Sequence, residues 1–438
     1  MKQNIFKWAV ITAVLIGNVF ISYGQNSKNT DSLALTEIIK EIISSHPSIK
    51  EAEEAIKDAD TKISIAKYSN YPDFDLTSSY TRIGPVTSLS FPGFGTFDMY
   101  PANNYSASVN YNQKLYDFGR KSLDVEYANK NKDATRETIE QVKQRLAMSA
   151  TNCYYAIVYL QDAIEIKNEQ LNTLREHLNY VEKKKATGSA TEYEILTTKV
   201  KISGIESQKM DLENALKVQL SIINSLIGKP QYISRLKKEL NTKSPGLNED
   251  SLISYAYGNR DEMKILKVKT ELSEIKYKVI KAQNNPMLNI FGNAGGKNGY
   301  IPDLNKIKAN FVAGIGFKLP IYDANRNKNN LLLAKSEIQI NNYEQELTKR
   351  NISNDIIENL TNISLATKKV KQFELQLNQA KEALRLAEAS YKAGTITNLE
   401  VLDATTSLSE SRLMLMKSHI DYTISILKLK NSIGERLY

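Results

Sequence analysis

Hydrophobic side chains recur at alternating steps of three and four residues through two long stretches of the chain. The first series runs through 157–181, interrupted by Lys167, and the second runs through 363–387. Each position of the second series lies 206 residues after a position of the first. Steps of three and four are typical of the seam between long packed helices. The pattern therefore predicts two equivalent helical seams.

Proline is absent from two blocks of the sequence that contain these seams. The blocks cover 102–229 and 321–438. Because proline breaks the interior of a helix, blocks of this length permit helices far longer than usual. We expect long helices at about 118–186 and 324–392, each about 100 Å long at about 1.5 Å per residue.

A glycine follows each predicted long helix. Gly188 and Gly394 stand where the chain has to reverse, and glycine readily adopts the left-handed geometry that ends a helix. The run Lys183–Lys185 complements the C-terminal end of its helix. The other predicted helices cover four segments: 33–68, 191–227, 249–282 and 397–433.

Three short stretches alternate hydrophobic and polar or small residues with a period of two, and 287–295 is a shorter strand candidate. This alternation is typical of strands with one face toward lipid and the other toward water, and about 9–11 residues cross a bilayer when tilted. Lipid tolerates no open sheet edge, so four strands must be pooled with those of other copies, and three copies give twelve. A small soluble sheet that caps a helical bundle is the alternative. The predicted strands cover about 73–83, 105–115, 286–295 and 310–320, with loops at 84–104 and 295–309.

The offset of 206 residues also relates three sequence motifs. A Tyr-Asp-x-x-Arg motif directly follows the second and fourth predicted strands. The turn segment 187–196 recurs as 393–402, and 227–228 recurs as 433–434. Three motifs in one register indicate an internal duplication. The residues of the first motif are Tyr116, Asp117 and Arg120 in one copy and Tyr322, Asp323 and Arg326 in the other.

The duplication divides the chain into two repeats after an N-terminal signal peptide. Residues 1–24 combine two lysines, a short apolar run and a small residue, which is typical of a secretory signal. We expect a first repeat at 25–230, a linker at 231–248 and a second repeat at 249–438.

Composition argues against several other classes of protein. The net charge of +9 is spread along the chain without an arginine-rich arm, so it gives no indication of nucleic-acid binding. Cys153 is the only cysteine, which excludes an internal disulfide. The three histidines, His46, His177 and His419, are scattered. We therefore expect no catalytic, cofactor-binding or metal site.

The paired Tyr-Asp-x-x-Arg motifs and the segment 391–404 resemble the TolC-type outer-membrane efflux protein family over essentially the whole mature length. The resemblance implies a mainly α fold with a β-barrel portion, assembled as a homotrimer. Its four transmembrane strands per chain would form a twelve-stranded barrel in outer-membrane lipid, above an α-helical periplasmic tunnel. The linker 231–248 would belong to an equatorial domain around that tunnel.

The resemblance also implies a function without enzymatic activity or cofactor. Members are passive exit ducts of tripartite efflux or type I secretion systems in the bacterial outer membrane. A periplasmic adaptor protein and an inner-membrane pump or secretion transporter deliver the substrate. The alternatives are a non-spanning helical periplasmic scaffold or adaptor, and an exported hydrolase. The hydrolase lacks any nucleophile and base constellation in this sequence.

The resemblance assigns roles to residues near the predicted turns. Glu400 and Asp403 match acidic rings that narrow the tunnel aperture, and Tyr391 and Glu194 match a latch at the tip. Ile396 stands where the family has a basic latch residue. The alternatives are a solvated helix face for Glu400 and Asp403, which lie three residues apart, and simple packing for Tyr391, which continues the seam.

Overall fold

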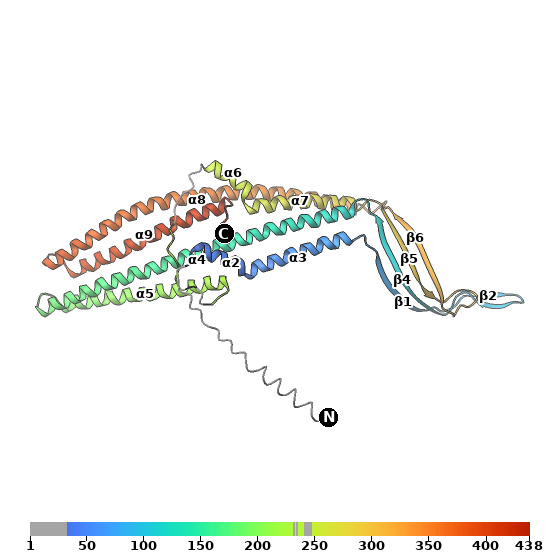
Figure 1. The fold of residues 1–438 in the computed structure, drawn as a ribbon, viewed down its shortest axis with the longest axis horizontal. Helices are drawn as coiled ribbons and strands as arrows, with labels where there is room; N and C mark the ends of the chain where they lie inside the picture. Colours follow the sequence, from blue (N-terminus) through green and yellow to red (C-terminus); the bar gives the residue numbers. More distant parts are fainter. Residues whose placement is uncertain (1–32, 231–232, 234, 241–247) are drawn as a thin grey trace, which may run out of the picture.

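The computed structural model describes a long, narrow molecule (Figure 1). It describes residues 33–230, 233, 235–240 and 248–438. Pairs of helices run to a tip at one end, and the strands lie at the other end. The predicted signal peptide at 1–24 lies outside the described residues. No helix in the described ranges has the length and the apolar character that crossing a membrane requires.

Most of the described chain is helical, in agreement with the predicted fold class. The helices are α2 Leu35–Ser45, α3 Pro47–Tyr68, α4 Arg120–Ala186, α5 Glu192–Ile227, α6 Glu249–Asn259, α7 Asp261–Ala282, α8 Arg326–Ala393 and α9 Asn398–Ser432. The two longest, α4 and α8, have 67 and 68 residues, so each is about 100 Å long. Helix α4 packs against α5 and helix α8 against α9, which confirms the two long helix pairs.

The prediction of one continuous helix in each of the segments 33–68 and 249–282 is wrong, because each contains two helices. The backbone is extended at His46, with φ −65° and ψ 131°. Proline disfavours helical geometry in the residue before it, so Pro47 accounts for this break. Arg260 has nearly the same geometry, φ −68° and ψ 134°, without a proline. The backbone N–H of Arg260 bonds to the carbonyl of Ala256 and closes the last turn of α6.

Four strands form one antiparallel sheet that contains both repeats. The strands of the chain are β1 Asp73–Arg82, β2 Ser88–Phe91, β3 Gly95–Asp98, β4 Asn103–Tyr116, β5 Met287–Lys297 and β6 Lys308–Lys318. The order β1-β4-β5-β6 makes β1 and β6 the edges. Strands β2 and β3 form a separate hairpin beyond the sheet (Figure 1), in the segment that was expected to be a loop.

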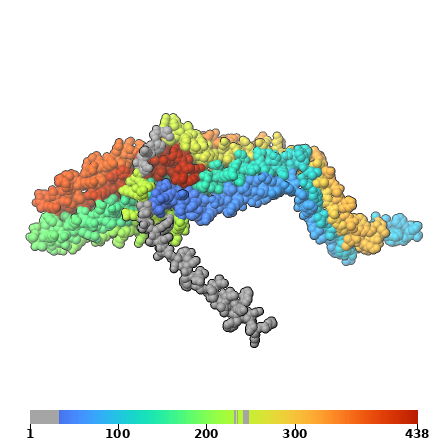
Figure 2. Space-filling view, in the orientation of Figure 1, coloured from blue at the N-terminus to red at the C-terminus, as the bar shows by residue number. Residues whose placement is uncertain are grey.

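The largest hydrophobic core lies near the middle of α4. There α4 and α5 meet α2 and α9 around Tyr154 and Ile157, both fully buried. The hydroxyl of Tyr155 donates to the carbonyl of Glu239 at 3.1 Å. The described residues of the linker therefore pack on the middle of α4. Toward the tip, Figure 2 shows the two helix pairs as separate parallel ridges.

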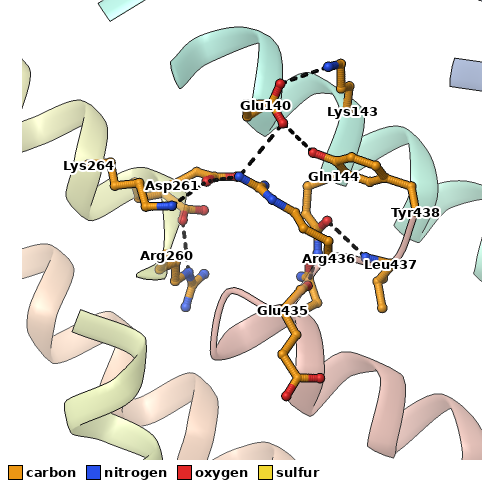
Figure 3. A network of polar contacts seen from close by, with 12 residues as sticks. Glu140, Lys143, Gln144, Arg260, Asp261, Lys264, Glu435, Arg436, Leu437 and Tyr438 are labelled. Carbon is orange, nitrogen blue, oxygen red and sulfur yellow. Dashed lines mark hydrogen bonds and ion pairs between the residues drawn. The ribbon is translucent and has the colours of Figure 1, made fainter. Parts of the chain in front are cut away.

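The residues after α9 connect the two repeats. The guanidinium of Arg436 donates to both oxygens of the buried Asp261 carboxylate at the start of α7, at 2.5 and 2.8 Å. The hydroxyl of Tyr438 donates to Glu140 of α4 at 2.6 Å. Gln144 of α4 donates to a backbone carbonyl of the same tail at 2.8 Å (Figure 3). We call Arg436 and Tyr438 the C-terminal clasp.

Candidate functional site

The tip is the end of the molecule where each long helix turns back. Gly188 follows α4 with φ 74°, and Gly394 follows α8 with φ 76°. Side chains are strained in this left-handed region, so both turns require glycine. Beyond each glycine a backbone N–H bonds to a carbonyl in the last turn of the helix, at 2.8 Å in the first repeat and 3.0 Å in the second. The two turns are duplicates in geometry as well as in sequence.

Each return helix begins with a threonine and a glutamate that cap each other. Thr191 and Glu194 form this pair in α5, and Thr397 and Glu400 form it in α9. The backbone N–H of Thr397 donates to Glu400 at 2.6 Å, and this bond lowers the pKa of the Glu400 carboxyl. Asp403 lies one turn further on and is exposed, as Glu400 is. Both carboxylates thus lie on the first turns of α9, and their role at an aperture stays a prediction.

Tyr391 and Glu194, predicted as a latch, are in direct contact. The hydroxyl of Tyr391 donates to Oε2 of Glu194 at 2.6 Å, so the end of α8 is bonded to the start of α5. Tyr391 is only 4% exposed and packs in a hydrophobic cluster with Val181, Ile195 and Val401. All four long helices contribute to this contact region, which we call the tip cluster.

The protonation states of the pair favour this hydrogen bond. Partial burial opposes ionisation of Glu194, but the hydrogen bonds from Tyr391 and Thr191 and the charge of Lys184 outweigh it and lower its pKa. Burial, and then the bond to Glu194, raise the pKa of Tyr391. At neutral pH a protonated phenol therefore donates to a carboxylate, which is the stronger, charge-assisted kind of bond.

Two polar residues of the tip cluster were not predicted. The amide of Asn398, which is buried, donates to the carbonyl of Glu194 at 3.3 Å, and its oxygen lies 2.6 Å from Nε2 of His177. The rings of His177 and Tyr391 lie 5.2 Å apart. The one signal in the sequence is a departure from the duplication, since Glu192 occupies the position equivalent to Asn398.

The tip cluster contains a lysine, although not at the position expected from the family. Ile396 packs against the hydrophobic part of the cluster. Lys184 belongs to the last turn of α4, where the lysine run was expected to complement the helix end. Its ammonium also lies 4.5 Å from the ring centroid of Tyr391 and 3.4 Å from the Tyr391 carbonyl oxygen.

At the opposite end, the Asp of each Tyr-Asp-x-x-Arg motif starts a long helix. The carboxylate of Asp117 accepts from the backbone N–H of Lys121 at 2.9 Å. Asp323 accepts from that of Asn327 at 2.8 Å. In both motifs, two consecutive residues with positive φ separate the Asp from its helix. The motif is therefore a strand-to-helix junction in both repeats.

The Arg residues of the two motifs differ in their surroundings. Arg120 is half-buried and donates to Ala282 and other backbone carbonyls at the end of α7. Arg326 is exposed. The tyrosines of the motifs, Tyr116 and Tyr322, are 58% and 84% exposed. The second junction thus leaves more of its motif uncovered.

Strands β1 and β4 have one aromatic face and one polar face, and Phe291 of β5 lies on the polar side, opposite Asn112. Phe74 stacks on Tyr111, and Tyr80 on Tyr105, each with ring centroids 5.1 Å apart. On the other face the hydroxyl of Ser79 lies 2.8 Å from that of Ser106. An apolar face with aromatic residues toward both ends fits lipid, and a hydrogen-bonded polar face fits water.

Two kinds of chemistry, metal binding and thiol reactivity, can be checked in the described part of the chain. Within it, no group of three or more His, Cys, Asp or Glu side chains could hold a metal ion. Cys153 is buried, and burial raises the pKa of its thiol to about 11. A thiol that stays protonated is a poor nucleophile and a poor metal ligand.

A sheet with an apolar and a polar face at one end, and long helix pairs that turn back at the other, are features of an outer membrane channel protein. The chain belongs to the outer membrane efflux protein family, whose model matches residues 38–229 and 252–435. Family membership assigns the protein to the outer membrane. The family is one of channels, not of enzymes.

Individual relatives are distant but cover most of the chain. The outer membrane protein TolC of Vibrio cholerae is 21% identical over 75% of this chain and 76% of its own length. The cation efflux system protein CusC of Escherichia coli K12 is 22% identical over 81% of this chain and 78% of its own length. The crystal structure of VceC from Vibrio cholerae covers 92% of this chain and 97% of its own, with a TM-score of 0.75 and 19% identity. The likeness to that structure concerns the fold.

Proposed function

We propose that this chain is one subunit of a homotrimeric exit duct that passively conducts substrates delivered by an inner-membrane pump through a periplasmic adaptor. The observation that best supports this proposal is the sheet with two unpaired edges, β1 and β6, at the end of helices about 100 Å long. Open edges are not tolerated in lipid, and three copies close a barrel of twelve strands. The same symmetry arranges the helix pairs as a tube.

The tip cluster is the part of the duct that has to move when a substrate leaves. Three-fold symmetry would bring three copies of Glu400 and of Asp403 around the axis, where clustered carboxylates attract cations. The bond between Tyr391 and Glu194 joins the two helix pairs of one subunit, so breaking it would let the pairs separate. These roles support a closed resting tip.

Relatives support a link with export systems. The name of CusC describes a component of a cation efflux system. By analogy, we place this chain in a tripartite efflux or type I secretion system, with cargo choice residing in the pump. A helical scaffold that never enters the membrane does not fit a member of an outer membrane family.

Conductance in a planar lipid bilayer tests the duct and its aperture together. The double variant Glu400→Gln with Asp403→Asn removes both charges, and glutamine can still cap the helix. We expect wild-type trimers to conduct with a preference for cations and the variant to lose most of that preference.

A matched control is Glu358→Gln, an exposed glutamate in the middle of α8, which should leave the selectivity unchanged. Well-folded wild-type trimers without any conductance would contradict the duct. Unchanged selectivity in the double variant would contradict the aperture role alone.

A further inference from the structure

Arg120 and Arg326 occupy equivalent positions in the two repeats, but their contacts differ. The guanidinium of Arg120 donates to the carbonyls of Ala282 and Gln283, each at 2.9 Å, and to that of Asn285. It therefore caps the C-terminal end of α7. The structure shows no hydrogen bond or ion pair of the Arg326 side chain with any described residue, and that side chain is exposed.

The end of α7 that Arg120 caps has a duplicate in the end of α3. Both helices have 22 residues. Their C-terminal caps, Ser69 and Gln283, have nearly identical backbones, φ −59° and ψ −19° against φ −60° and ψ −21°. One further backbone hydrogen bond of 2.9 Å closes each turn, and a proline, Pro72 or Pro286, follows. The carbonyls that Arg120 uses thus recur in the same arrangement at the end of α3.

The two helix ends differ in how well they are covered. Ala282 of α7 is 5% exposed, whereas its equivalent in α3, Tyr68, is 60% exposed. Asn285 is half-buried, whereas its equivalent, Tyr71, is 61% exposed. Within a single copy, the end of α3 contacts the start of α4 only from one side, where Asn70 donates to Asp117 at 3.1 Å and the Lys121 ammonium lies 5.7 Å from the Tyr71 ring. Tyr68 and Tyr71 stay largely exposed, whereas α4 covers the end of α7.

The order of the sheet indicates which element covers α3. Strand β4 pairs with β5, and this pairing sets α4 beside α7. The edges β6 and β1 have no such neighbour within the sheet. If β6 of one copy pairs with β1 of the next, α8 comes to lie beside α3 of that copy, as α4 lies beside α7.

The exposed face of α8 supports the same arrangement. On α4, the face toward α7 carries Lys130, whose ammonium pairs with Glu271 at 2.8 Å. The equivalent face of α8 carries Leu333, Ile340 and Leu347, which are 70%, 59% and 58% exposed. A spacing of seven residues aligns these side chains into one stripe, as in helices that pack against a partner.

We infer that Arg326 of one copy caps the C-terminal end of α3 in the neighbouring copy. It donates to the carbonyls of Tyr68 and Ser69 of that copy as Arg120 donates to those of Ala282 and Gln283. The partner of this surface is therefore a second copy of the chain. The inference rests on the proposed oligomer and adds to it a specific contact at each subunit boundary.

The chemistry of arginine suits this contact. The carbonyls at the end of a helix carry the negative end of the helix dipole, so a cation is favoured there. The planar guanidinium has five N–H donors and can bond several carbonyls at once, which the ammonium of lysine matches poorly. Arg326→Lys should therefore restore only part of what Arg326→Ala removes.

Cross-linking in isolated outer membranes tests the contact directly. In a Cys153→Ala background, one chain carries Arg326→Cys with Tyr71→Cys, and a matched control carries the equivalent pair Arg120→Cys with Asn285→Cys. A short bifunctional thiol reagent should join subunits into covalent dimers and trimers in the first chain. In the control it should give only an internal cross-link within one subunit.

Two results would overturn the inference. One is a reactive control pair together with no intersubunit product from the Arg326 and Tyr71 positions. The other is an unchanged dissociation temperature of the detergent-solubilised oligomer in Arg326→Ala, where we expect a decrease of about 2–4 °C. Light scattering of the wild-type protein separates these outcomes from a failure of the proposed function. A wild-type monomer would contradict the duct itself, whereas a wild-type trimer with either result contradicts only this contact.

Discussion

The two long helices are nearly equal in length and arise from the same duplicated sequence, yet their environments differ. Helix α4 has 67 residues, of which 18 are buried, whereas α8 has 68, of which nine are buried. Helix α4 packs against α2, α3, α5, α7 and α9, whereas α8 packs against α6, α7 and α9. Helix α4 thus lies inside the row of helices, and α8 lies at its edge. Two helices from a duplicated sequence can therefore have different neighbours, because one lies inside the row and the other at its end.

Because of this difference, contacts of α4 and α8 should contribute differently to the stability of the single chain. The side chains of α4 stabilise the single subunit, because their partners belong to the same chain. The exposed stripe on α8 has no partner among the described residues of the same chain, so it contributes little to the stability of a single copy. Variants at matched positions on the two helices should therefore affect different measurements.

The largest effect is expected for Ile157→Ala in α4. Ile157 is fully buried, so truncation leaves a cavity and should lower the free energy of unfolding of the subunit by about 2–5 kcal/mol. Urea titration of dissociated subunits in detergent, followed by circular dichroism, measures it. The matched variant Ile340→Ala, at a position 59% exposed on α8, should change the same quantity by no more than about 0.5 kcal/mol. Equal losses of unfolding free energy from the two variants would contradict the claim that α4 stabilises the single subunit more than the exposed face of α8 does.

A smaller effect is expected for Arg436→Ala in the C-terminal clasp. The Asp261 side chain is only 7% exposed, so removing its two-pronged donor should lower the free energy of unfolding by about 2–3 kcal/mol. Arg385 of α8 makes the same two-pronged contact with Glu382, but the two side chains are 65% and 56% exposed. In the same urea titration, Arg385→Ala should be indistinguishable from wild type, because water screens exposed ion pairs. A loss in Arg385→Ala as large as that in Arg436→Ala would show that burial does not set the difference.

The long helices and the longer strands were predictable, because their periodicity and the absence of proline can be read from neighbouring residues. Helix α4 begins at Arg120 where the seam and the absence of proline predicted 118, and β1 covers Asp73–Arg82 where alternation predicted 73–83. The break at His46 has a cause in the sequence, Pro47, although 33–68 was predicted as one helix. The break at Arg260 has no proline to mark it. The β2–β3 hairpin was missed because its strands have only four residues each, too few to show an alternation.

The tip was predictable only in part, because its contacts join residues that lie far apart in the sequence. Tyr391 and Glu194 could be paired through the resemblance to the family. His177 and Asn398 lie 221 residues apart. Their contact depends on how α4 and α9 are rotated toward each other, which no local pattern encodes. Lys184 was correctly placed at a helix end, but its approach to the Tyr391 ring is likewise a product of the assembled tip.

The smallest effect is expected at the tip, for the hydrogen bond between Tyr391 and Glu194. Glu194 and Glu400 occupy equivalent positions and both cap their helices. Only Glu194 also accepts from a tyrosine of the described chain. Tyr391→Phe removes that bond and keeps the ring, which should favour tip opening by about 1 kcal/mol. In single-channel recordings the ratio of open to closed time should rise roughly five-fold. The control Tyr180→Phe changes a neighbouring tyrosine of the same cluster and should leave that ratio unchanged.

The pH dependence of opening separates loss of this bond from general loosening of the tip. Because the folded tip lowers the pKa of Glu194 below its ordinary 4.5, ionised Glu194 stabilises the arrangement in which it is bonded to Tyr391. That stabilisation is complete above pH 4.5 and is lost as the pH falls through the lowered pKa. Acid should therefore increase opening of the wild-type channel in this range. Tyr391→Phe, already without the bond, should respond less to acid. An acid response in Tyr391→Phe equal to that of wild type would mean that the bond between Tyr391 and Glu194 does not hold the tip closed.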